Sequence, residues 1–282
     1  MRPKIKSFAA ASFLVVAALT GIATGQATLT RTVYKTDKLD FGVGGTIVIA
    51  GAPNGSIRIE GWSNNEIEIS AEIELKASTE AELNQLEKVT GFILDESSLR
   101  LSIFSVGVND RKHLKSVAKS FPKNLLNAPF RIDYVIKVPR FADLTVDGGK
   151  GDLYIGGVEG TFKLNYLDTN ATLDLVGGAT AATFGNGDIT VNVPSKSWRG
   201  RFVDVQLASG KMHVSLPPGL NSNFDASILR TGTITNTFTE FKPRVRKAEF
   251  TDKMIAARSG TGGITMKFMV GDGTMEIFPQ KK

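Results

Sequence analysis

Two short stretches of sequence decide the fold: Gly151-Asp152-Leu153-Tyr154-Ile155 and Gly187-Asp188-Ile189-Thr190-Val191. In each, a glycine and one variable residue precede two apolar residues that are spaced by two. Four further segments, beginning at Ala171, Gly210, Gly232 and Gly262, follow the same pattern, with Asn236 breaking the copy at Gly232. The six starts are separated by 20, 16, 23, 22 and 30 residues. A degenerate repeat near 20 residues, with a small residue at each corner, is typical of a solenoid.

The repeat has a direct physical reading. Glycine accepts a positive φ at a sharp corner, and the strand that follows points alternate side chains inward. We therefore predict an all-β fold of the β-solenoid or parallel β-helix type, a stack of short strands with one or two short helices. A β-sandwich with glycine turns is the alternative. The predicted corner positions are Gly151, Gly187, Gly210, Gly232 and Gly262.

The chain before the repeats also reads as strands. A Thr-rich strand is predicted within residues 28–40, and three short strands follow around residues 46–49, 56–59 and 66–69. Apolar and polar residues alternate in the last two, the period of a half-buried strand. The spacing of ten residues predicts that Ile47, Ile57 and Ile67 lie together on one face.

Two helices interrupt the strands. Thr79 and Glu82 form a capping-box pattern before an apolar stripe, which predicts a helix over about residues 79–90 that would cap the strand edges. A basic insert at about residues 107–125 has apolar residues at helical spacing and predicts an amphipathic helix. Its lysines are interpreted as solvated, although a basic helix on an anionic surface is the functional alternative. We expect residues 26–140 to form the N-terminal part, continuous with repeats over residues 141–282.

The amino-acid composition excludes several kinds of chemical site. The 282 residues include no cysteine and two histidines, which excludes disulfides, thiol catalysis and zinc sites built on cysteine or histidine clusters. Residues 1–25 combine three basic residues, an apolar stretch and a small-residue site, the order of a cleaved signal peptide. We therefore expect export to the periplasm, the cell surface or the medium, with no transmembrane segment in the mature chain. The net charge of +6 would fall to +3 on cleavage, which suits an anionic envelope surface. No motif or basic arm indicates nucleic acid.

Candidate catalytic groups are few. Asp152 and Asp188 share the position after a corner glycine, and a two-carboxylate pair is what a glycoside hydrolase needs. Aspartate after glycine is, however, ordinary turn chemistry. His213 is expected to point outward from a strand, and Gly148-Gly149-Lys150-Gly151-Asp152 matches a calcium repeat only loosely. We predict no enzyme activity, no catalytic residues, no cofactor and no metal; a polysaccharide-degrading enzyme on a β-helix is the alternative.

Candidate binding residues fall into two kinds. Basic residues gather between positions 242 and 247, where they would bind an anionic envelope polymer such as an acidic glycan, or phospholipid headgroups. Alternatively, they protect a strand edge from aggregation. Two tryptophans would stack on sugar rings or pack a corner. The predicted binding residues are Lys242, Arg244, Arg246, Lys247, Trp62 and Trp198.

Three features resemble the bacterial putative-adhesin family, a domain of unknown function in exported proteins. They are Gly61-Trp62 before residues 66–69, the run Tyr134–Pro139 leading into Ala142–Val146, and the Gly-Asp-Leu and Gly-Asp-Ile repeats. The resemblance spans about residues 40–280 and departs from the family at the basic insert. It implies a β-solenoid-like envelope protein with no assigned enzyme activity. We predict an exported, non-enzymatic, adhesin-like envelope protein that presents a β-solenoid surface to a glycan, a lipid or another envelope protein. In some relatives it implies a structural or signalling role in envelope stress.

Overall fold

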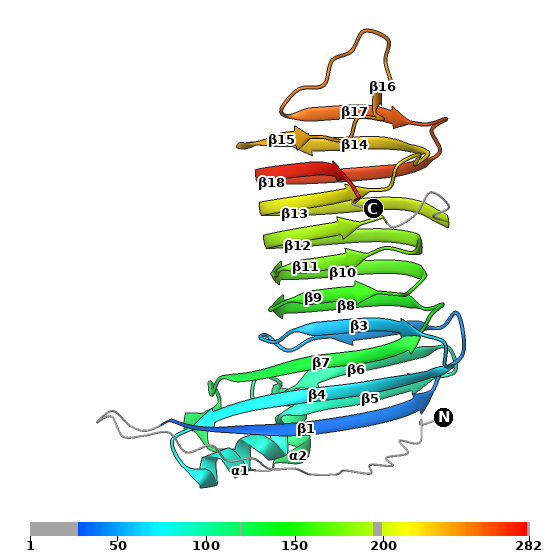
Figure 1. The fold of residues 1–282 in the computed structure, drawn as a ribbon. Helices are drawn as coiled ribbons and strands as arrows, with labels where there is room; N and C mark the ends of the chain where they lie inside the picture. The colour runs from blue at the N-terminus through cyan, green and yellow to red at the C-terminus, as the bar shows by residue number, and fades with distance from the viewer. Residues whose placement is uncertain (1–27, 119, 194–198, 281–282) are drawn as a thin grey trace.

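The computed structural model describes residues 28–118, 120–193 and 199–280. The predicted signal peptide and Trp198 lie outside these ranges. All 18 described strands belong to one hydrogen-bonded sheet, and they surround one hydrophobic core. Figure 1 shows the strands running across an elongated molecule, with the two helices at one end and a loop projecting at the other.

The elements follow one another along the chain in three groups. We call the N-terminal group, including its helices, the base. It contains β1 (Leu29–Asp40), β2 (Thr46–Ala50), β3 (Ile57–Trp62), β4 (Glu66–Ala77), α1 (Glu80–Val89), β5 (Gly91–Ser97), β6 (Arg100–Val106), α2 (Arg111–Val117), the 3-10 helix η1 (Lys123–Leu125) and β7 (Phe130–Pro139). The repeat segment contains β8 (Asp143–Lys150), β9 (Leu153–Gly156), β10 (Gly160–Asp168), β11 (Ala171–Asp174), β12 (Gly177–Asn192) and β13 (Arg199–Leu216). The C-terminal group contains β14 (Ser222–Ile228), β15 (Gly232–Asn236), β16 (Lys242–Pro243), β17 (Met254–Ser259) and β18 (Ile264–Pro279).

The sheet has two sides that face each other across the core. One side runs through β6, β2, β8 and β10, and the other through β4, β7, β3, β9 and β11. The long strands β12, β13 and β18 bend in the middle and give one half to each side. Along the strands of these two sides, alternate side chains therefore point into the core, and the others point outward.

The prediction of a β-solenoid or parallel β-helix is wrong. The structure is mostly β with two short helices, and its single mixed sheet curls until it nearly closes into a barrel-like shape. Antiparallel pairs occupy both ends: β1 with β4, β4 with β7 and β5 with β6 at the base, and β14 with β17 at the far end. Strands β5 and β6 form a local hairpin, with Ser97 paired to Arg100. The other antiparallel pairs join strands that are distant or non-consecutive in the chain, so local repeats in the sequence could not reveal them.

The last strand lies out of sequence order. β18 pairs with β13 along nearly its whole length and with β14 on its other edge, so it separates two strands that are consecutive in the chain. Strands β14 to β17 are thereby carried to the end of the molecule (Figure 1). The segment beginning at Gly262 leads into the first half of β18, and this strand bends later, at Gly273.

Most of the predicted corner glycines form one column at the bends. Glycines 151, 187, 210 and 232 all have φ between +119° and +137°, and each lies against backbone of the adjacent strand. Gly262 has a positive φ but lies in the loop before β18, outside the column. The predicted start at Ala171 is two residues late, since Thr169 occupies the bend next to Gly187. A non-glycine residue at this bend hides the correct register.

The N-terminal strands pair differently from the prediction. Ile47, Ile57 and Ile67 are all buried, but they do not lie side by side as the spacing of ten residues predicts. Strand β2 pairs with β6 and β8, whereas β7 separates β3 from β4. The hydrophobic pattern within a strand determines which of its side chains are buried, but equal spacing along the chain does not determine which strands become neighbours.

Both predicted helices are present. The hydroxyl of Thr79 accepts from the Glu82 N–H at 3.2 Å, which confirms the N-terminus of α1. The second helix is shorter than the basic insert: Asp110 caps it, and it ends at Val117. Leu114 is its one buried side chain, so the lysines on this helix are exposed to solvent.

Candidate functional site: a polar face on the parallel strands

The most regular surface of the molecule is the outer side of β3, β9, β11, β12, β13, β18 and β15. These strands pair in parallel and in register, from the base to the far end in Figure 1. Equivalent outward side chains therefore repeat at about 4.8 Å across the strands. We call this surface the polar face. Its central row consists of Arg58, Tyr154, Thr172, Thr190, His213, Glu276 and Thr235.

A hydrogen-bonded cluster organises the part of the face nearest the base. The guanidinium of Arg58 lies 4.0 Å from the centre of the Tyr154 ring and also bonds Glu60. The Tyr154 hydroxyl donates to Asp174 at 2.9 Å, and the amide of Asn192 donates to the same carboxylate at 2.7 Å. The bond to Asp174 is the largest cause that raises the pKa of Tyr154. The aromatic ring is thus fixed in place on a half-exposed surface.

Amide–carboxylate pairs link neighbouring strands. Asn170 donates to Asp152 at 3.2 Å, and Asn192 to Asp174, each across 18 residues of sequence. A third pair, Asn165 with Asp147 at 2.9 Å, lies on β10 and β8, on the opposite side of the sheet. The sequence carries this signal as a repeated Asp-to-Asn spacing of 18. A repeat that starts at Ala171 leaves Asn170 outside its pattern, so the predicted register conceals these pairs.

The two candidate catalytic aspartates are not free to flank a substrate. Asn170 lies between them: its amide nitrogen donates to Asp152, and its oxygen accepts from the Asp188 N–H at 3.4 Å. An inverting hydrolase needs open space between its carboxylates for a sugar and a water. His213 lies farther along the same face, with its Nδ1 3.1 Å from Glu276, in the central row.

The predicted binding residues do not form one site. Trp62 lies at the end of β3 on the same side of the strand as Arg58 and Glu60, and so borders the polar face. Its indole N–H donates to the Glu66 carbonyl, and Lys137 lies 5.4 Å from its ring centre. The four basic residues between positions 242 and 247 are exposed at the far end of the molecule, beyond β17. Several strands therefore separate them from Trp62.

Hollows occur elsewhere on the molecule. One of about 560 Å³ is lined by Pro53, Ser105, Asn109, Arg111 and Phe130, near α2. Another of about 420 Å³ lies at the loop after β1, beside Asp40 and Glu96. Among the residues that the structure describes, no group of three or more His, Cys, Asp or Glu side chains is arranged to hold a metal ion. Within the same ranges, no helix is long and apolar enough to cross a membrane.

Comparison with known proteins gives structural neighbours only. No protein-family model matches the chain, and no curated protein sequence matches it. The crystal structure of a putative cell adhesion protein from Clostridium sporogenes has a TM-score of 0.46 and 14% identity, covering 88% of this chain and 100% of that one. A putative adhesin from Bacteroides fragilis has a TM-score of 0.37 and 10% identity, with coverages of 87% and 97%. A putative lipid binding protein from Parabacteroides distasonis has a TM-score of 0.28 and 12% identity, with coverages of 87% and 96%.

Proposed function

We propose that the chain is an exported, adhesin-like binding protein of the cell envelope, and that its polar face holds an extended glycan without transforming it. The observation that carries this proposal is the series of in-register parallel strands that presents Arg58, Tyr154 and the paired Asp174 and Asn192 on one surface. Export is proposed from the basic, apolar and small-residue order of residues 1–25.

The chemistry of the face suits a sugar polymer. Sugar hydroxyls both donate and accept hydrogen bonds, and the face offers amides, carboxylates, hydroxyls and a guanidinium in rows. Tyr154 and Trp62 add aromatic surface of the kind that is enriched at binding interfaces. Small ligands usually need a concave pocket, whereas a surface that extends across seven strands suits a long partner.

The polar face is also preorganised. Asp174 accepts from both Tyr154 and Asn192, and Asn170 bridges Asp152 and the backbone of Asp188. Side chains that are already fixed lose less conformational freedom when a ligand binds. The same bonds occupy the carboxylates, which supports holding a glycan over cleaving it.

The test is co-sedimentation of the purified exported protein with sacculi and with a panel of purified polysaccharides. We expect saturable binding to at least one of these glycans. Tyr154→Ala should weaken binding roughly tenfold or more, since it removes an aromatic contact and one of the two hydrogen bonds that hold Asp174. Reducing and unsaturated ends are assayed in the same samples.

A matched pair of variants makes the test specific to the face. Asn170→Ala removes an amide from the polar face, and Asn165→Ala removes the equivalent amide from the opposite side. The first should weaken glycan binding about fivefold, the value of one hydrogen bond, and the second should leave it unchanged. Equal losses in both variants, glycan binding by none of the samples, or release of new sugar ends would each overturn the proposal.

A further inference from the structure

The loop between β16 and β17 carries a concentration of positive charge. Strand β16 and the first four residues of this loop are Lys242, Pro243, Arg244, Val245, Arg246 and Lys247, all exposed, and we call them the basic tip. Arg244 pairs with Asp225 on β14, while no ion pair of the other three cations occurs among the described residues. Glu249 and Asp252 follow later in the same loop, so the negative charge lies beside the basic tip and not within it.

Apolar side chains are exposed in the same loop. Val245, between two arginines, is 68% exposed, and Met254, where the loop enters β17, is 59% exposed. A polyanionic sugar would gain nothing from these side chains. A bilayer accepts both features, because basic residues contact its headgroups while apolar ones enter the boundary with the acyl chains.

The structure holds the basic tip at the extremity of the molecule. Phe241 packs against Phe224 and Phe238, with ring centres 4.6 and 4.9 Å apart, and Phe250 packs on the core from the other end of the loop. The Arg244 N–H donates to Ala256 of β17, and Lys247 adopts a φ of +67°. The loop projects beyond the last strands in Figure 1, so that a flat surface can reach it without meeting the rest of the chain.

We propose that the basic tip docks on the surface of a bilayer that contains anionic phospholipid. Electrostatic attraction supplies most of the binding, and Val245 and Met254 enter the interface. The polar face lies along the side of the molecule and stays exposed when the basic tip is docked. The two surfaces act independently, and neither proposal depends on the other.

The test is flotation of the purified exported protein with phosphatidylcholine vesicles, with and without phosphatidylglycerol. We expect binding to the anionic vesicles alone, and weaker binding as salt is raised. Each basic residue near an anionic bilayer contributes roughly a fivefold gain in partition, so the triple variant Lys242→Gln, Arg246→Gln, Lys247→Gln should bind roughly 100-fold more weakly. Arg244 is left in place because it pairs with Asp225.

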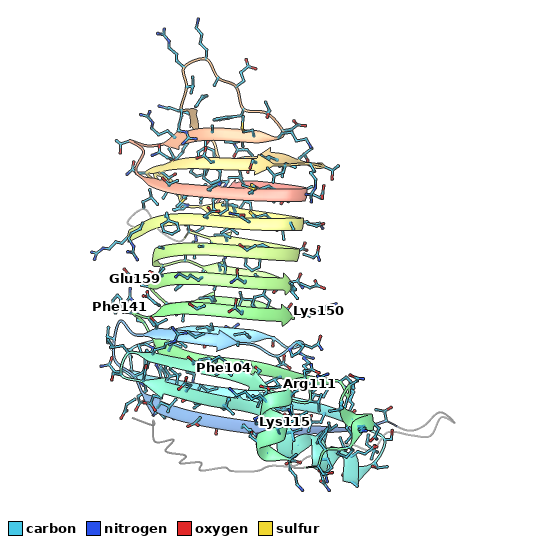
Figure 2. The ribbon with its side chains drawn as sticks, turned by 180° about the vertical axis from the view of Figure 1, so that it is seen from behind. Phe104, Arg111, Lys115, Phe141, Lys150 and Glu159 are labelled. Carbon is cyan, nitrogen blue, oxygen red and sulfur yellow. The ribbon has the colours of Figure 1, made fainter. Side chains whose placement is uncertain are left out.

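The matched control removes the same charge from the opposite end. Arg111, Lys112 and Lys115 are exposed on α2, and Figure 2 shows Arg111 and Lys115 at the base, away from the projecting loop. Changing these three residues to glutamine should leave vesicle binding within about twofold of the parent, because they lie away from the docked surface. Equal loss in both triple variants would mean that net charge alone matters, and it would overturn the proposal.

A second variant separates lipid from acidic polysaccharide. Val245→Ser with Met254→Gln keeps every charge but should weaken vesicle binding roughly tenfold, through lost apolar burial. Unchanged vesicle binding by this variant, or binding of the parent to acidic polysaccharide in preference to anionic vesicles, would contradict a bilayer as the partner. Circular dichroism of each variant establishes that the fold is intact.

Discussion

The base and the repeat segment enclose the hydrophobic core in different ways. In the base, side chains close the core: α1 buries Leu83, Leu86 and Val89 beneath antiparallel strands, and Arg31 of β1 pairs with Glu80 and Glu87. In the repeat segment, backbone meets backbone at the glycine bends, where Gly151, Gly187 and Gly210 lie against carbonyl groups of the neighbouring bend. Gly55 of the base is packed in the same way, against the Ile132 carbonyl group with a φ of +141°. The contrast therefore applies to the loop after β1, around Gly42, which should tolerate an added carbon, whereas the glycine bends of the repeat segment should not.

The largest effect is expected from Gly187→Ala. A Cβ at this position would lie 1.8 Å from the Thr169 carbonyl oxygen, and φ is +132°, so the strand spacing must open. We expect a loss of about 4 kcal/mol or more in the free energy of unfolding, since a clash with backbone adds to an unfavourable φ. Urea denaturation monitored by circular dichroism measures this loss of stability.

Gly42→Ala is the control for this comparison. Gly42 follows β1 in the base, and nothing lies within 4 Å of the Cβ it would gain. Its unfolding free energy should stay within about 0.5 kcal/mol of the parent. If both alanine variants lost similar stability, the contrast between backbone-packed bends and tolerant loops would be wrong.

Alkaline pH should weaken both regions through one buried tyrosine in each. Burial raises the pKa of Tyr134 in the base to about 12, and it also raises the pKa of Tyr166 in the repeat segment. The unfolded chain loses these protons near pH 10, so the stabilisation is complete below that pH and declines as pH rises toward 12. Tyr134 alone should account for a loss of about 2–3 kcal/mol in the free energy of unfolding over this pH range.

Urea titrations at a series of pH values between 8 and 12 test this expectation. The parent should lose stability steeply above about pH 10, and Tyr134→Phe should show a shallower decline because it cannot ionise. A variant whose pH profile matched the parent would show that Tyr134 does not contribute.

The smallest effect should distinguish the two tyrosine hydroxyls at neutral pH. Tyr134 shares a hydrogen bond of 2.8 Å with Ser105, whereas the buried Tyr166 hydroxyl has no partner among the residues that the structure describes. Tyr134→Phe should cost about 1 kcal/mol, and Tyr166→Phe should be neutral or slightly stabilising. Thermal unfolding of the two variants side by side measures the difference. A larger loss of stability in Tyr166→Phe than in Tyr134→Phe would contradict this assignment of hydrogen-bond partners.

Local signals in the sequence predicted local features well. Thr79 and Glu82 located α1, because a capping box depends on residues three apart. Period-2 alternation identified Ile57 and Ile67 as core residues. The polar face was less visible: Asp152 and Asn170 carry the repeat spacing of 18, but Thr169 at a glycine bend displaced the register by two residues.

The sequence by itself determined which side chains face the core, most of the glycine bends and how the first helix begins, since each depends on neighbours along the chain. Only the tertiary structure decided that β18 lies between β13 and β14, that β7 separates β3 from β4, and that the sheet is mixed. Burial is nearly the same for any strand placed beside an apolar edge, so alternation cannot choose the partner. The choice comes from the combined packing of distant strands, and it also sets the basic tip apart from the polar face.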